Sequence, residues 1–375
     1  MKKLLMVGLG DLGGHVLELL CSARVPIRIV ASDIDEESGY RKTNLVQYVA
    51  SQMGFDTNID FRKIDLYNIE ETAGLISDVS PDIIFTSASL QSWWVINFLP
   101  KEVFDKLDKA RFGPWLPMHL TLLYKLMQAV KLSGRRPLVL NASFPDVTHQ
   151  ILSKIGLAPD CGIGNVHNLI QPIRRSVADI LRVPVESVTV YVYMAHFVSH
   201  YVPRFGDTGK GSCLMKVHVD GRDMSGVVKP NEVFMSLPKR WRRTGSVGGQ
   251  ILTAASAASI IRAVALDSKE LLHAPGPLGL PGGYPVRVGE KGAQVVLADG
   301  VSMEKAIAVN EEGNRVDGVE KVLDDGTAIF TEKEMAIMKE MLGYDLKQMK
   351  IEESEKMAKE LGNRFKEFAS RFRKA

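Results

Sequence analysis

The sequence predicts an α/β protein in which a doubly wound parallel sheet is followed by a mixed α+β domain. Up to residue 143, near-continuous apolar segments alternate with helical segments, which is typical of a parallel sheet covered on both faces. The first apolar segment also runs straight into a glycine-rich turn and a helix. Beyond residue 143 the strand-like segments become β-branched and aromatic. We therefore expect two domains, 1–143 and 144–375, and 375 residues that are 45% hydrophobic can bury a core in each.

The glycine-rich turn follows the buried strand expected at 3–8. Gly8 permits a tight turn, Gly10 lets the backbone approach a pyrophosphate, and Gly13 lets helix and strand pack closely. The phosphates would lie at a helix N-terminus, where free N–H groups favour anions. This pattern predicts a Rossmann-type dinucleotide site. Its expected turn residues are Gly8, Gly10, Asp11, Leu12 and Gly13.

The second expected strand, 27–32, leads to Asp33, which lies 20 residues after Gly13. An acid at this distance accepts hydrogen bonds from ribose hydroxyls and repels a 2′-phosphate. The sequence therefore favours NAD over NADP as the cofactor, although Arg41 and Lys42 lie nearby in the chain.

Three further strands are expected at 59–64, 82–87 and 137–141. The fourth strand ends in the small residues Ser87 and Ala88, where the nicotinamide half of a dinucleotide would cross the sheet. The fifth ends at Asn141. We add Ser87 and Ala88 to the expected cofactor site.

The connection 89–118 contains three of the four tryptophans and several helix breakers. A long connection at the carboxyl edge of such a sheet is the usual place for a substrate lid. The alternative is an extra packing element or a subunit contact.

The second half predicts strands at 188–195 and 214–219, a buried helix at 247–266, and strands separated by turns over 283–330. One of those turns is expected at 312–314. A capping box at 331–334 predicts a helix to 342, and 345–373 predicts an amphipathic charged helix. The basic motif Lys239 to Arg243 is interpreted as a solvated surface turn, with an anion-binding role as the alternative.

Composition sets bounds on the partners. The net charge of +3 is spread along the chain, which argues against a nucleic-acid binder. No apolar run reaches the ~20 residues of a membrane span, and no cleavable signal is evident. Three scattered cysteines lack metal-ligand spacing. We expect a reduced, cytoplasmic protein without a metal, acting on a small molecule as a homodimer or homotetramer.

Several segments, taken in order, resemble the lactate/malate dehydrogenase superfamily, which also includes NAD-dependent family 4 glycosidases. They are the glycine turn with Asp33, and residues 141–148, 162–168, 191–197, 283–289 and 331–342. The resemblance implies an NAD-dependent oxidoreductase that transfers hydride between nicotinamide and a hydroxyl/keto group of a small carboxylated substrate. It also implies that Asn141 contacts cofactor and substrate.

The resemblance places a proton-exchanging histidine at His196, and imidazole suits this task near neutral pH. His200 is the alternative. The family orients its histidine with an aspartate, but the aligned position here is Asn168. A carboxylate could come instead from Asp146 or Asp207.

The arginine with which the family binds a substrate carboxylate aligns with Gln171. Arg174 and Arg175 follow within one helical turn, and a forked guanidinium at Arg174 would serve as the substitute. The lid arginine falls near Arg111. These departures, with the tryptophan-rich lid, imply a substrate larger or more apolar than lactate or malate.

Three alternatives stay open. A family 4-like glycosidase would need a metal, for which Cys161, His167 and His196 are the candidate ligands. Residues 61–66 and 80–84 resemble strands of sugar-nucleotide epimerases and dehydratases, but the Tyr-x-x-x-Lys pair of that class is missing from the sheet region. A non-enzymatic NAD sensor would explain the loss of family residues at Asn168 and Gln171.

Overall fold

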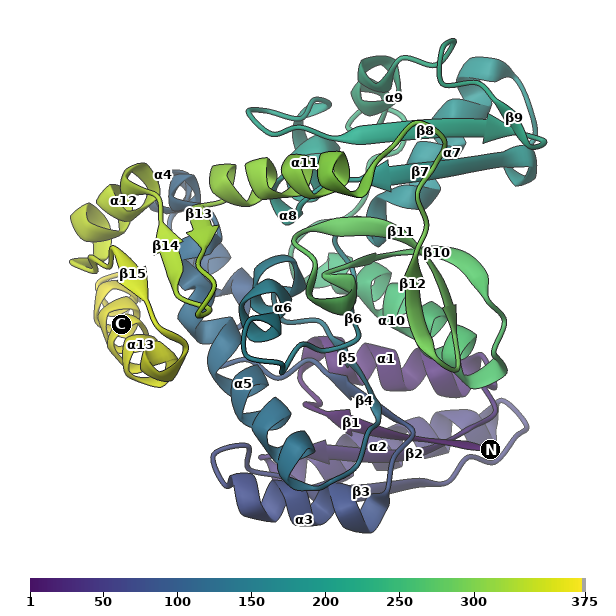
Figure 1. Ribbon diagram of the computed structural model, residues 1–375. Helices are drawn as coiled ribbons and strands as arrows, with labels where there is room; N and C mark the ends of the chain where they lie inside the picture. Colours follow the sequence, from purple (N-terminus) through teal and green to yellow (C-terminus); the bar gives the residue numbers. More distant parts are fainter. Residues whose placement is uncertain (373–375) are drawn as a thin grey trace.

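The computed structural model describes residues 1–372 and contains a six-stranded parallel sheet (Figure 1). Its strand order is β3-β2-β1-β4-β5-β6, the doubly wound order in which β1 and β4 lie side by side at the point of reversal. Ligands of such sheets bind outside the carboxyl ends of the strands at that point. The strands are β1 Lys2–Val7, β2 Ile27–Asp33, β3 Ile59–Lys63, β4 Ile83–Thr86, β5 Leu138–Asn141 and β6 Cys161–Gly162.

Helices cover both faces of the sheet because successive strand residues point to opposite sides. Leu4 and Met6 of β1 face a core shared with α1 and α10, whereas Leu5 and Val7 face a core shared with α3 and α5. The predicted doubly wound sheet is therefore confirmed. The flanking helices are α1 Asp11–Ser22, α2 Glu36–Gln52 and α10 Gln250–Leu266 on one side, and α3 Ile69–Val79 and α5 Leu116–Leu132 on the other.

The sixth strand, β6, comes after residue 143, so a segment of the expected second domain completes the first sheet. The mixed part of the molecule then follows, as predicted. It contains two antiparallel sheets, β7-β8-β9 and β10-β11-β12. The elements are α6 Pro145–Ser153, α7 His167–Leu181, β7 Val188–Tyr193, α8 His196–Phe205, β8 Leu214–Val219, β9 Arg222–Asp223, α9 Pro230–Ser236, β10 Glu270–Pro275, β11 Gly283–Gly289 and β12 Gly292–Val295.

The helix α10 is the buried helix expected from the Ala- and Ile-rich segment. Contrary to the expectation that no apolar run reaches the length of a membrane span, residues Val247–Leu266 could cross a membrane by length and composition alone, and 44% of the segment tested is buried inside the molecule. Ala254, Ala257 and Ile261 are fully buried, and α10 packs along α1. In this fold the apolar residues of α10 thus serve the core.

The expectation of strands and turns throughout 283–330 is wrong for its middle part. Residues Met303–Val316 form helix α11, which is capped where the Ser302 hydroxyl accepts a hydrogen bond from the Lys305 N–H. The expected turn at 312–314 lies inside this helix. Gly313 is needed there for packing, because a Cβ on Gly313 would come within 2.5 Å of the Ala195 Cβ. The presence of Gly313 was interpreted as a sign of a turn, whereas this glycine admits a close neighbour inside a helix.

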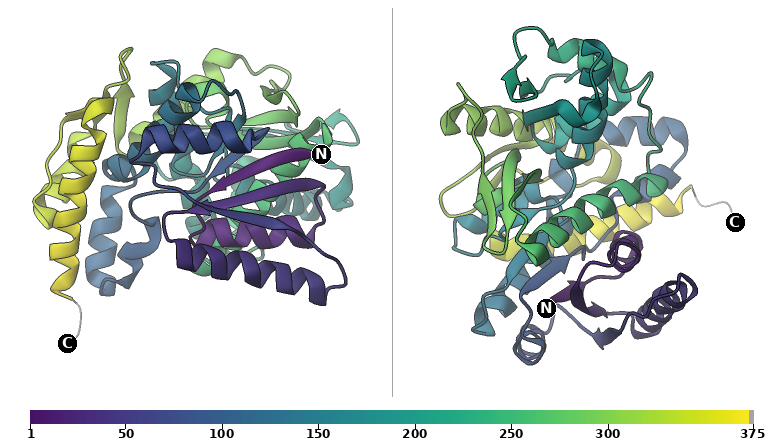
Figure 2. Two further views of the ribbon diagram at one scale, coloured as in Figure 1. Left: turned by 90° about the horizontal axis from the view of Figure 1, so that it is seen from below. Right: turned by 90° about the vertical axis from the view of Figure 1, so that its right-hand side faces the viewer.

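The C-terminal part forms a small sheet of β13 Val319–Val322, β14 Ala328–Phe330 and β15 Gln348–Met349, with helices α12 Glu332–Leu342 and α13 Ser354–Ser370. Figure 2 shows α13, in yellow, as a long helix at the outer edge of the molecule, and it packs against α5. The amphipathic helix expected over 345–373 is thus shorter, and Arg373 lies outside the described residues. Thr331 begins α12 as predicted, but its hydroxyl bonds to the Glu334 carboxylate, and no side chain caps the backbone.

Candidate active site

The glycine turn between β1 and α1 lies at the carboxyl edge of the sheet. Gly8 has a φ of +93°, which residues with a side chain rarely adopt. A Cβ on Gly13 would lie 2.0 Å from the Gly8 carbonyl oxygen. Gly10 has no heavy atom within 4 Å of the position of a Cβ, so the space above it is open. No side chain caps the N-terminus of α1, which begins at Asp11. The turn therefore combines close packing beneath with free N–H groups and room above.

Asp33 at the end of β2 is tied to this turn. Its Oδ2 accepts a hydrogen bond of 2.6 Å from the Leu9 N–H, and its Oδ1 accepts one of 3.0 Å from the Asp35 N–H. Lys42 donates to the Leu9 carbonyl, whereas Arg41 forms an exposed ion pair with Glu37. A carboxylate has further lone pairs, so Asp33 retains acceptor capacity toward a ribose.

The small residues after β4 pack against the same turn. The Ser87 hydroxyl donates to the Gly8 carbonyl over 3.1 Å, and the Ala88 N lies 3.0 Å from where a Gly8 Cβ would be. Asn141 after β5 is fully buried. Its amide donates to the Ser143 carbonyl and lies 3.1 Å from the His149 Nε2, so the side chain supports the turn into α6.

A cavity of about 520 Å³ begins at Leu12 in the glycine turn and extends past His196. The segment after β4, predicted to be a lid, forms one of its walls. That segment contains the 3₁₀ helix Trp93–Phe98 and helix α4 Lys101–Leu107. Trp93 and Trp115 line the cavity, while Trp94 packs edge-on against Phe98. The Asn97 amide joins this segment to the wall that contains Ser246 by donating to the Ser246 hydroxyl over 2.8 Å.

His196 is the first residue of α8, which two residues separate from the end of β7, and its Nδ1 lies 2.6 Å from the Oδ2 of Asp317. Both side chains are sheltered, with 13% and 4% of their surfaces exposed. Burial lowers the pKa of His196, but the charge and hydrogen bond of Asp317, together with the charge of Asp146, outweigh burial and raise it above its usual value. The pair is a geometry suited to proton transfer.

Asp317 was missed from the sequence. It follows directly after α11, the helix that was expected to be strands and turns. It carries no local motif, and 121 positions separate it from His196. Only recognition of the helix ending at Val316 would have drawn attention to the carboxylate beside it.

The three residues considered for this orienting role lie elsewhere. Asn168 lines the cavity and donates to the Thr253 hydroxyl over 2.9 Å, while its buried Oδ1 has no partner among residues 1–372. Asp146 is fully buried and binds the Asn165 amide. Burial raises its pKa to about 6, against the effect of the nearby His196. Asp207 accepts a hydrogen bond from Gly209 in its own turn.

Of the candidate arginines, only Arg111 lines the cavity. It lies over the Phe197 ring, 5.1 Å from the centroid, and has a φ of +62°. Arg174 instead donates to the carbonyls of Val185 and Val188, each over 2.8 Å, and so holds the start of β7 against α7. Arg175 lies over the Trp241 ring outside the cavity.

Two further histidines adjoin His196. The His200 ring centroid is 4.3 Å from that of His196, and burial, followed by the charges of His196, Arg243 and Arg204, holds the His200 pKa well below its usual value. His119 lies 3.0 Å from the Ser143 hydroxyl, and burial lowers its pKa to about 3. Both are neutral near pH 7, so His196 is the histidine tuned for protonation.

No protein-family model matches the sequence, and no curated protein sequence matches it. Solved structures do. Malate dehydrogenase from Plasmodium falciparum is 18% identical, with a TM-score of 0.56 over 84% of this chain and 96% of its own. Lactate dehydrogenase from Cryptosporidium parvum, complexed with lactic acid and nicotinamide adenine dinucleotide, is 16% identical, with a TM-score of 0.57 over 84% and 96%. Lactate dehydrogenase from Eimeria maxima, with NADH and oxamate, is also 16% identical, with a TM-score of 0.56 over 84% and 92%.

The chain has the lactate/malate dehydrogenase fold. The resemblance noted in the sequence is thus confirmed at the level of architecture. At this low identity it is the residues of this chain that must indicate its chemistry.

The glycosidase alternative requires a metal site, and residues 1–372 of this lactate/malate dehydrogenase fold do not provide one. Among residues 1–372, no group of three histidine, cysteine or acidic side chains lies close enough to hold an ion. Cys161 is fully buried among apolar side chains, and burial raises the pKa of its thiol. Burial also lowers the His167 pKa to about 4.

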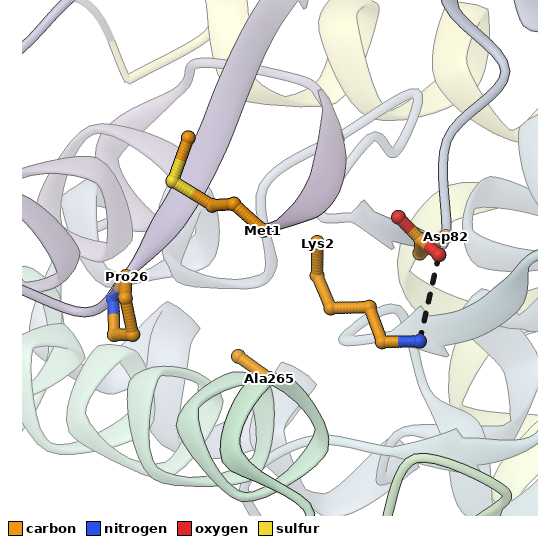
Figure 3. A pocket seen from close by; sticks show the side chains of 5 residues that line it. All are labelled: Met1, Lys2, Pro26, Asp82 and Ala265. Atoms are coloured by element: carbon orange, nitrogen blue, oxygen red, sulfur yellow. Dashed lines mark ion pairs between the residues drawn. The ribbon is translucent and has the colours of Figure 1, made fainter.

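A second depression lies at the amino ends of the sheet strands (Figure 3). It is lined by Met1, Lys2, Pro26, Asp82 and Ala265, and an ion pair joins the Lys2 Nζ to the Asp82 Oδ1 over 3.5 Å. Ligands of doubly wound sheets bind at the opposite edge. The cavity around His196 is therefore the candidate active site.

Proposed function

We propose that this protein is an NAD-dependent oxidoreductase that transfers hydride between nicotinamide and a hydroxyl/keto group of a small carboxylated substrate. One observation carries the proposal: the His196–Asp317 pair lies in the cavity that opens onto the glycine turn at Leu12. A proton-transfer group and a dinucleotide-type turn in one cavity are what a hydride-transfer enzyme of this kind requires.

The residues at the sheet edge suit NAD. The open space over Gly10 and the uncapped N-terminus of α1 would receive the pyrophosphate, because free N–H groups and the helix dipole favour anions. Asp33 would accept hydrogen bonds from the adenosine ribose and disfavour a 2′-phosphate. When bound, the nicotinamide accepts or supplies the hydride.

His196 carries the proton. Asp317 holds the Nδ1–H of His196 by a hydrogen bond, which leaves Nε2 to face the substrate. During oxidation the neutral imidazole takes the proton of the substrate hydroxyl. Hydride leaves the carbon that bears this hydroxyl, and the substrate becomes a ketone. During reduction the imidazolium returns the proton to the carbonyl oxygen. Asp317 stabilises the imidazolium in both directions.

Aromatic rings shield this step from water. The Phe112 ring stacks on His196 with centroids 4.7 Å apart, and Phe144 approaches its edge at 5.2 Å. Charge interactions are stronger in such a water-poor site. Arg111 presents a guanidinium to the same cavity and is our candidate for binding the substrate carboxylate.

Titration of the purified protein with NADH and with NADPH, followed by nucleotide fluorescence, tests the cofactor. We expect NADH to bind more tightly. A panel of hydroxy acids assayed with NAD then tests turnover. His196→Asn is expected to leave NADH binding intact and to lower turnover by about 10²–10⁴-fold. His218→Asn, outside the cavity, is the matched control. Failure of both nucleotides to bind would contradict the proposal.

A further inference from the structure

One face of helix α8 runs along the cavity. His196, His200 and Arg204 are spaced by four residues, so they share this face, and all three line the cavity. Arg204 lies eight positions after His196, which corresponds to about 12 Å along the helix at a rise of ~1.5 Å per residue. The cavity therefore continues well beyond the proton-transfer group.

A second arginine lies near this face, because its charge, like that of Arg204, acts on His200. Arg243 lines the cavity from the segment before α10 and belongs to the basic motif that was expected to be a surface turn. The structure divides that motif. Arg240 pairs with Asp179 over 2.7 Å on the surface. Arg242 and Arg243 are both exposed, but only Arg243 also lines the cavity. Only Arg243 joins Arg204.

The charges of the cavity do not balance. Three arginines and two aspartates line it, and one of the aspartates, Asp317, is used by His196. The other, Asp108, approaches Arg204 at 3.4 Å. Arg111 and Arg243 have no carboxylate within 4.0 Å among residues 1–372. The unpaired guanidiniums occupy two places: Arg111 lies over the Phe197 ring, and Arg243 lies close enough to His200 for its charge to act on that imidazole.

The space between these charges is aromatic. The Trp93 ring lies 6.5 Å from that of His200, and Tyr201 and Phe197 stack at 5.2 Å. His200, kept neutral by its surroundings, adds no charge. An apolar or aromatic group would desolvate these surfaces favourably, whereas a bare chain of polar groups would not.

We propose that the substrate is an extended dianion, with its reacting carboxylated end at His196 and Arg111 and a second acidic group bound by Arg204 and Arg243. An apolar or aromatic spacer joins the two ends. The inference rests on the proposed function and specifies its substrate class. Lactate-sized and malate-sized acids are too short to reach from His196 to Arg204.

Binding of straight-chain dicarboxylates, from oxalate to sebacate, tests the length of the site. Calorimetry is performed on the protein alone and with saturating NADH. The expected result is that the longest acids bind at least tenfold more tightly than malonate. A parallel series of ω-phosphonocarboxylates distinguishes a carboxylate from a phosphate as the second group. Affinity that does not depend on length in either series would overturn the proposal.

Matched arginine variants test the far end. Arg243→Gln and Arg204→Gln are each expected to lower the affinity for the long acids about tenfold or more and to leave that for malonate unchanged, because each removes a charged hydrogen bond to the second acidic group. Arg242→Gln, one residue away but outside the cavity, should bind like the unaltered protein. An equal loss in Arg242→Gln, or no loss in Arg243→Gln and Arg204→Gln, would overturn the assignment.

The two proposals fail separately. If NADH does not bind but the long acids still need Arg243, the cofactor proposal is wrong and the dianion site stands. If NADH binds and length has no effect, only the dianion site is wrong. Melting curves of each variant check that it folds.

Discussion

The Nδ1 of His196 and the Oδ2 of Asp317 lie 2.6 Å apart across an interface between two distant parts of the chain. The other carboxylate oxygen of Asp317 accepts a hydrogen bond of 3.2 Å from the Phe112 N–H, so one side chain orients both the imidazole and the ring stacked on it. The Asp317 carboxylate therefore fixes the geometry of the proposed catalytic pair from two directions.

The pH profile of oxidation should reveal this pair. Since the pKa of His196 is raised above 6.5, oxidation needs the pH to rise through that higher value before the imidazole is neutral. In Asp317→Asn the burial effect dominates, so the rising limb should move to lower pH while the rate falls by about 10²-fold. Steady-state rates at a series of pH values measure both. Asp207→Asn is the control, and an unmoved limb in Asp317→Asn would refute the coupling.

The stability that the His196–Asp317 pair contributes should also depend on pH. It should fall as the pH rises, whereas the rate of oxidation should rise. A group whose pKa is higher in the folded state stabilises that state below its unfolded pKa, and the contribution is lost as the pH rises through the folded value. We expect Asp317→Asn to cost about 1.5–3 kcal/mol near pH 6 and less at alkaline pH. Urea unfolding at both pH values measures the difference. A loss that stays constant with pH would show that charge is not the cause.

The glycine turn offers a graded test. Gly13→Ala would place a Cβ 2.0 Å from the Gly8 oxygen. We therefore expect the free energy of unfolding to fall by about 1–3 kcal/mol and NADH to bind more weakly. Gly10→Ala meets no atom within 4 Å and should fold normally but bind NADH more weakly. Gly14→Ala, equally unobstructed and inside α1, is the control for both. Normal NADH binding by Gly13→Ala would contradict the expected packing role.

Asp33 should determine the choice of cofactor. Asp33→Asn removes the charge that disfavours a 2′-phosphate and one acceptor used by the backbone of the turn. The ratio of NADPH to NADH dissociation constants should therefore fall about tenfold, chiefly through weaker NADH binding. Asp60→Asn, at an exposed ion pair on β3, is the control. An unchanged ratio would assign Asp33 to structure alone.

The first half of the molecule was predictable because its signals are local. The strand from Lys2 to Val7, the glycine turn and the helix after it are neighbours in the chain, and their apolar residues fix the layers of the sheet. The small residues at Ser87 and Ala88 were predictable for the same reason. Their positions follow from the order of parallel strands.

The second half depends on contacts that no local pattern encodes. Gly313 resembles a turn residue until its neighbour, Ala195, is known. Arg174 and Arg243 are both arginines in basic segments, yet one binds backbone carbonyls and the other faces the cavity. Which of them meets a ligand depends on how helices pack, and packing follows from the whole chain.

Finally, the Asn97–Ser246 hydrogen bond and the hydrogen bonds of Asp317 limit which sequence changes this protein can accept in evolution. The Gly113 N–H donates to the Asp317 carbonyl over 2.7 Å, and a Cβ on Gly113 would strike Gly318. Surface loops usually tolerate insertions, but an insertion here would displace the carboxylate that holds the imidazole. New substrate preferences should therefore arise by replacements along α8 and at Arg243, with the segment after β4 kept at constant length.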